Sequence, residues 1–168
     1  MKSRKFSVLL LLVIVSISLV ACGGGSAENV VKTVIDNTFG YSESLKPEER
    51  YKAITEVLTP EVQQDEYESM PEFLENASPI YTNGIDKPYF IAVDPSQPQS
   101  DSFQSFLVHI PASSLKLPPS SKDQYARITL RDLDGWKITE IDSGSKLSSV
   151  LENETLQTKL EWKEVEPF

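Results

Sequence analysis

Cysteine and histidine often act as nucleophiles, metal ligands or acid–base catalysts. The chain of 168 residues contains only one of each. A lone cysteine excludes an internal disulfide and a cysteine-rich zinc site. His109 lies in an alternating segment, on the side opposite Phe106, Val108 and Ile110. No Ser or Cys nucleophile motif accompanies it. We therefore expect a strand histidine that faces solvent or a hydrogen-bonded cavity wall, and the alternative is a general base.

Carboxylates gather at two places in the sequence. The first group, around the last predicted hairpin, consists of Asp132, Asp134, Glu140 and Asp142. It lacks the full ligand spacing of a calcium loop, so we predict no metal site and no cofactor. The second group, which we expect to form a solvated helix face rather than a glycosidase-type carboxylate pair, consists of Asp65, Glu66, Glu68, Glu72 and Glu75.

Large aromatic side chains in the second half serve either as core or as the wall of a small-molecule pocket. They are Tyr81, Tyr89, Phe103, Tyr125 and Trp136. We expect core, because a domain of this size needs such side chains in its interior; a pocket in which His109 faces Tyr125 or Tyr89 is the alternative. Asn153-Glu154-Thr155 matches a glycosylation sequon, which we interpret as a coincidence.

The first half of the chain has the periodicity of helices. Ser26 is suited to cap a helix that ends at Gly40, and a second helix follows Pro47 with Val57 and Leu58 on its apolar side. Thr59-Pro60 predicts the start of a third helix. A further helix is expected after the capping box formed by residues 69–72.

The second half alternates in the manner of strands. The expected strands are Lys87 to Asp94, Phe103 to Ile110, Gln124 to Asp132 and Trp136 to Ile141. Asp134-Gly135 predicts a hairpin turn between the last two. We therefore predict an α+β domain with N-terminal helices packed on a curved antiparallel sheet of about four to six strands. After Ser143, a short helix through Leu147 and Leu151 fits, and the residues up to Trp162 suit either a helix or an extra edge strand.

The N-terminus has the layout of a secretory signal. Lys2, Arg4 and Lys5 precede an apolar run from Phe6 to Ala21, which is shorter than the roughly 20 residues of a spanning helix. An uncleaved transmembrane anchor is the alternative interpretation. The run ends in Leu19-Val20-Ala21-Cys22, which resembles the lipobox of bacterial lipoproteins.

This resemblance implies that Cys22 receives a diacylglyceryl group on sulfur and an N-acyl chain, after residues 1–21 are removed as a signal peptide. More than one acyl chain anchors a protein stably, at about 0.8 kcal/mol per buried CH₂. Residues 22–26 then form a glycine-rich tether, and residues 27–168 form a single domain with a C-terminal extension from about residue 143.

The mature chain is acidic. Loss of three of the 16 basic residues leaves 13 against 25 acidic residues, a net charge of −12. Nucleic-acid binding needs a basic surface, so we exclude that class of partner. The same charge favours a domain that stands off an anionic membrane surface.

Helices followed by a meander closing in Asp134-Gly135-Trp136-Lys137-Ile138 are similar to the nuclear transport factor two-like superfamily of cone-shaped α+β domains. The resemblance implies helices packed into the concave face of a curved sheet, in a superfamily that includes enzymes, transport factors and secretion-machine subunits.

We expect a lipid-anchored protein on the extracytoplasmic face of a bacterial cell membrane, acting as a non-enzymatic binding or assembly module with an envelope protein as its partner. An accessory subunit of a secretion or conjugation apparatus is one version. A small isomerase or dehydratase with a cone pocket is the alternative.

Overall fold

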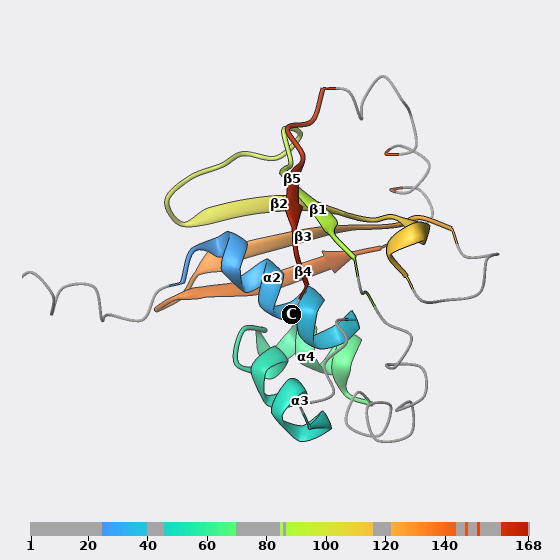
Figure 1. The fold of residues 1–168 in the computed structure, drawn as a ribbon. Helices are drawn as coiled ribbons and strands as arrows, with labels where there is room; N and C mark the ends of the chain where they lie inside the picture. The colour runs from blue at the N-terminus through green and yellow to red at the C-terminus, as the bar shows by residue number, and fades with distance from the viewer. Residues whose placement is uncertain are drawn as a thin grey trace, which may run out of the picture.

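The computed structural model describes residues 25–39, 46–69, 85, 87–115, 122–143, 147, 151 and 159–167, and helices precede strands within them (Figure 1). The helices are α2 (Ala27–Phe39), α3 (Pro47–Thr55) and α4 (Pro60–Tyr67). The strands are β1 (Tyr89–Val93), β2 (Phe103–Ile110), β3 (Gln124–Asp132), β4 (Trp136–Asp142) and β5 (Lys163–Val165), with a 3₁₀ turn at Ala112–Ser114. The predicted α+β class is therefore confirmed. Cys22, residues 70–72 of the capping box with the helix expected after them, and the sequon lie outside the described residues.

The three described helices begin at the residues that the local sequence signals predict. The Asn29 N–H donates to the Ser26 hydroxyl (3.3 Å) at the start of α2. Pro47 and Pro60 occupy the first turns of α3 and α4, where a missing N–H costs nothing.

The prediction that Val57 and Leu58 continue α3 is wrong, because the helix ends at Thr55. The segment that follows pairs instead with the edge strand β4: the Ile138 N–H donates to the Val57 carbonyl (2.8 Å), and the Thr59 N–H donates to the Ile138 carbonyl (3.0 Å). These bonds cover backbone groups that an open sheet edge would leave unpaired.

The strands form one antiparallel sheet in the order β4-β3-β2-β1-β5. Asp134 and Gly135 take positive φ values of 60° and 114°, which confirms the predicted hairpin turn between β3 and β4. An extra edge strand is present but lies later than predicted: Leu160 and Trp162 precede it, and Lys163–Val165 pairs with β1. β1 and β5, the first and last strands along the chain, are therefore neighbours in the sheet.

Alternation along the strands gives the sheet two apolar faces. The larger core packs the helices against one face, with Val31, Val34, Ile54 and Ile91 fully or almost fully buried. A smaller core on the opposite face is made of Ala92, Leu107 and Tyr125 from the strands and Leu147, Leu151 and Leu160 from the C-terminal part. Among the described residues, no helix is both long and apolar enough to cross a bilayer.

Leu130 and Leu133 form a matched pair for testing this core. Leu130 is fully buried under the helices, whereas Leu133 at the hairpin is 52% exposed. Leu130→Ala should lower the free energy of unfolding by about 2–5 kcal/mol through lost burial and a residual cavity. Leu133→Ala should change it by less than about 0.5 kcal/mol. Urea titration of both variants checks this, and equal losses would contradict the burial of Leu130 in the larger core.

Candidate functional site

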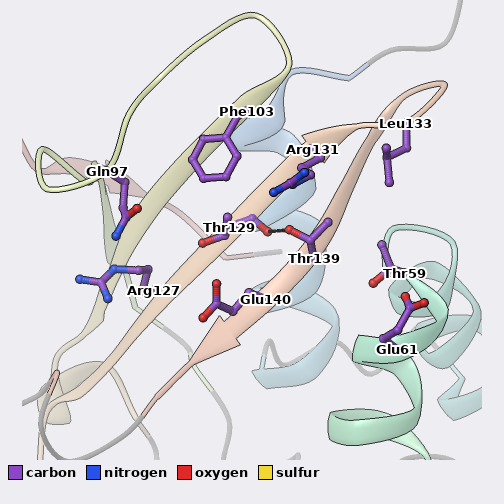
Figure 2. Close-up of a pocket in the computed structure, with 10 residues that line it drawn as sticks. All are labelled: Thr59, Glu61, Gln97, Phe103, Arg127, Thr129, Arg131, Leu133, Thr139 and Glu140. Atoms are coloured by element: carbon purple, nitrogen blue, oxygen red, sulfur yellow. Dashed lines mark hydrogen bonds between the residues drawn. The ribbon is translucent and has the colours of Figure 1, made fainter.

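The face of the sheet opposite the helices carries a groove of about 570 Å³ (Figure 2). Strands β2, β3 and β4 form its floor, Gln97 comes from the loop after β1, and Thr59 and Glu61 come from the start of α4. The other lining residues are Phe103, Arg127, Thr129, Arg131, Leu133, Thr139 and Glu140. A groove of this volume is in the range of small-ligand and peptide sites.

Arg127 is held in place at one end of the groove by a buried carboxylate. Its Nε donates to Oδ2 of Asp94 at 2.5 Å, and its Nη1 lies 3.7 Å from Oδ2 of Asp142. Asp94 is 1% exposed, and its Oδ1 also accepts hydrogen bonds from the Ser96 N–H (2.8 Å) and hydroxyl (2.6 Å). The positive charge of Arg127 is thus balanced by the protein itself, and its role in the groove is structural.

Arg131 differs from Arg127 although both point from β3 toward the same groove (Figure 2). Its guanidinium carbon lies 5.7 Å from the centroid of the Phe103 ring, a cation–π distance. In the part of the chain that the structure describes, no ion pair with a carboxylate involves Arg131. The exposed Glu140 supplies the opposite charge from β4. The groove therefore combines a cation on an aromatic ring with a carboxylate, an arrangement that suits a partner carrying both charges.

The floor between these charges is polar. The Thr139 hydroxyl donates to the Thr129 carbonyl (3.3 Å), and the Thr129 hydroxyl lies 3.5 Å from that of Ser105. A β-bulge at Thr129/Leu130 inserts Thr139 as an extra residue in β4. Because a bulge re-aims the side chains beside it, it contributes to the shape of this surface.

His109 lies outside the groove, on the same face of the sheet. Its ring stacks on Tyr125 (centroids 4.6 Å apart) and Phe90 (5.9 Å), and Trp162 lies against it at a tilt (5.7 Å). Its Nε2 is hydrogen-bonded to Oδ2 of Asp123 at 2.7 Å. The predicted side of the strand and a hydrogen-bonded environment are confirmed. The suggested pairing with Tyr125 exists, whereas Tyr89 faces the helices and does not meet His109.

Asp123 anchors this histidine to the following turn. Its Oδ1 accepts a hydrogen bond from the Ala112 N–H at 2.8 Å. Partial burial by itself would raise the pKa of Asp123, but the hydrogen bonds from Ala112 and His109, together with the histidine charge, bring that pKa below its ordinary value. The His109 ring therefore packs beside Tyr125 and Trp162 of the smaller core while Asp123 holds it from the other side.

The sequence analysis missed a buried carboxylate on the helix side. Asp36 is 1% exposed; its Oδ2 lies 2.7 Å from the Lys32 Nζ, and its Oδ1 accepts a hydrogen bond from the Tyr89 hydroxyl (3.1 Å). Burial raises the pKa of Asp36, while Lys32 and Tyr89 oppose the rise. Burial and the nearby Asp36 also raise the pKa of Tyr89. The Lys32–Asp36 spacing of four residues within an apolar helix face was the available signal.

This carboxylate borders a second cavity, of about 530 Å³, that also contacts Glu166 and Pro167 near the C-terminus. Lys32 Nζ donates to the Glu166 carbonyl at 2.6 Å. Asp36, Lys32 and Tyr89 therefore tie α2 to both β1 and the residues after β5. Because the Lys32 ammonium and the buried Asp36 carboxylate pair with each other, we interpret the network as structural.

The carboxylates predicted near the last hairpin do not come together in one site. Asp132 accepts a hydrogen bond from the Gly135 N–H (2.9 Å), whereas Glu140 faces the groove and Asp142 approaches Arg127. Within the described ranges, no three His, Cys, Asp or Glu side chains are grouped to hold a metal ion.

The second carboxylate group and the predicted aromatic residues do not form a site either. Asp65, Glu66 and Glu68 are exposed at the end of α4 as a solvated face, while Glu72 and Glu75 lie outside the described residues. The structure does not gather the aromatic residues into one pocket: Tyr89 and Trp136 pack on the helix side, Phe103 lines the groove, Tyr125 belongs to the smaller core, and Tyr81 lies outside the described residues.

Comparisons of the chain with protein-family models, with curated proteins and with solved structures give no match.

Separate removal of the two arginines tests whether Arg127 stabilises the fold while Arg131 does not. Arg127→Ala leaves the buried Asp94 without its cation and should lower the free energy of unfolding by about 1–3 kcal/mol. Arg131→Ala removes an exposed cation and should change it by less than about 0.5 kcal/mol. Thermal or urea unfolding of the two variants measures the difference. A loss at Arg131 as large as that at Arg127 would contradict these roles.

Proposed function

We propose that the chain is a lipid-anchored binding module on the extracytoplasmic face of a bacterial cell membrane. The observation that carries the anchor is the sequence Leu19-Val20-Ala21-Cys22 after a basic head and an apolar run. A diacylglyceryl group and an N-acyl chain on Cys22 would hold the acidic domain at the membrane without a spanning helix.

The groove across β2, β3 and β4 is the surface we assign to binding. It is open, its floor is polar, and Arg131 and Glu140 offer charges of both signs to a partner. Such a surface suits an exposed segment of an envelope protein, since a peptide brings backbone donors and acceptors together with side chains of either charge.

The order and layering of the elements also support membership of the nuclear transport factor two-like superfamily, in which helices precede a curved antiparallel sheet. A role as an accessory subunit of a secretion or conjugation apparatus is one form of the proposed module. His109, on which the isomerase or dehydratase alternative depends, packs between aromatic rings outside the groove, which favours binding over catalysis.

Lipidation is testable in a bacterial host grown with labelled palmitate. The wild-type chain should incorporate the label, and its N-terminal peptide should begin at a modified Cys22. Cys22→Ser should incorporate none, because the alkylated sulfur is lost, whereas Ser26→Ala should keep the label. A wild-type chain that begins at Met1 with a free thiol would disprove the anchor.

Binding through the groove is testable by site-specific photo-crosslinking in cells. A photoreactive residue in place of the groove residue Glu140 should give a discrete adduct, while one in place of Gln124, exposed at the far end of β3, should give none. If the charges recognise the partner, Arg131→Ala should weaken the adduct from position 140. Identical adduct patterns from both positions would argue against the groove as the binding surface.

A further inference from the structure

The β3–β4 hairpin, the β1–β2 loop and the start of α2 lie toward the same end of the sheet. The Asp132 N–H at the β3–β4 hairpin donates to the Ser102 carbonyl in the loop before β2 (3.1 Å), so hairpin and loop are neighbours. Helix α2 runs opposite to β1: the Phe39 carbonyl accepts a hydrogen bond from the Ile85 N–H ahead of β1. The start of α2 is therefore directed toward the end where β1 stops. In Figure 1 the start of α2, the hairpin and the β1–β2 loop all lie on the left side of the domain.

The short tether between Cys22 and α2 limits how far this end of the sheet can lie from the membrane. Only four residue steps separate Cys22 from Ser26, which limits the backbone between them to about 14 Å. Strand β2 has eight residues and therefore spans about 25 Å from Phe103 to Ile110. An anchor at Cys22 thus keeps the hairpin end nearer to the lipid surface than the end that carries the 3₁₀ turn.

The hairpin end also exposes apolar side chains. Leu133 at the hairpin and Val93 at the end of β1 are each 52% exposed. Within the described part of the chain, only Phe39 is a further large apolar residue of comparable exposure, and it lies at the other end of α2. Exposed leucine beside aromatic and cationic side chains is typical of segments that rest at a membrane interface.

Local charge opposes such a contact less than the acidity of the whole mature domain suggests. At the hairpin, Arg131 and Lys137 balance Asp132 and Asp134, and the exposed Asp101 of the neighbouring loop leaves these residues with a net charge of −1.

We infer that the hairpin end of the sheet rests on the bilayer that holds the anchor, with Leu133 entering the interface. The inference builds on the proposed lipidation of Cys22. In this orientation the groove opens beside the membrane surface, within reach of partners in the same membrane.

Fluorescence quenching on the full lipidated chain tests this orientation. Lipidation consumes the thiol of Cys22, so a cysteine introduced elsewhere is the only one that takes up a thiol-reactive probe. Leu133→Cys and Asp101→Cys report on the hairpin end, and Ser113→Cys and Gln124→Cys report on the opposite end; all four positions are exposed. The labelled proteins are placed in phosphatidylcholine vesicles that contain a lipid with a nitroxide on its headgroup.

We expect several-fold stronger quenching from positions 133 and 101 than from positions 113 and 124. Leu133→Glu, combined with the probe at position 101, should reduce the quenching there. Equal quenching at both ends of an anchored protein would overturn the inference and leave the proposed function standing. If the wild-type chain takes up the probe, Cys22 is free, and both the proposed anchor and this orientation fail.

Discussion

The double-sided burial of strand β2 is the constraint on which the rest of the structure depends. Phe106, Val108 and Ile110 face the helices, whereas Leu107 faces the smaller core on the opposite side. A strand in this position needs a cover on both faces, because exposing either one would leave apolar surface in water. Helices α2, α3 and α4 supply one cover. The C-terminal residues Leu147, Leu151 and Leu160 supply the other.

The groove exists because the second cover is partial. The C-terminal residues pack over the region of Ala92, Leu107 and Tyr125, and the polar stretch of the same face toward the hairpin stays open. On β3 the change falls between Tyr125 and Arg127, neighbours on the same side of the strand. Tyr125 is part of an apolar core, while Arg127 is satisfied by Asp94. A buried carboxylate of this kind requires a cation, so the Asp94–Arg127 pair fixes the boundary between core and groove.

The strength of the sequence signals explains which expectations held. Strands Phe103 to Ile110 and Gln124 to Asp132 were predicted with the bounds they have, since alternation and the Asp134-Gly135 turn are local properties. The end of α3 was missed because Val57 and Leu58 continue its apolar pattern, yet their backbone pairs with Ile138 in β4. That choice depends on an edge strand about eighty residues away, which no local pattern encodes.

The candidate site was predictable only in part. The alternation within Gln124 to Asp132 puts Arg127, Thr129 and Arg131 on the side opposite the apolar residues, but it does not distinguish the paired arginine from the one above Phe103. The partner of Arg127, Asp94, lies 33 residues earlier, and only the order of the strands brings the two side chains together. His109 was expected to face either solvent or a hydrogen-bonded cavity wall, but its stack with Phe90, Tyr125 and Trp162 depends on cross-strand pairing and on the C-terminal residues.

The sequence by itself determined the order and type of the elements from α2 to β4, the hairpin turn and the side of each of these strands that is apolar, because these follow from backbone sterics and from spacing along the chain. It also supplied the lipobox-like segment on which the proposed anchor rests. Only the tertiary structure decided that β5 joins β1, that the C-terminal residues cover part of the second face, and that a groove remains beside them. Those outcomes depend on contacts between distant segments, whose energies come from surfaces that exist only once the sheet has formed.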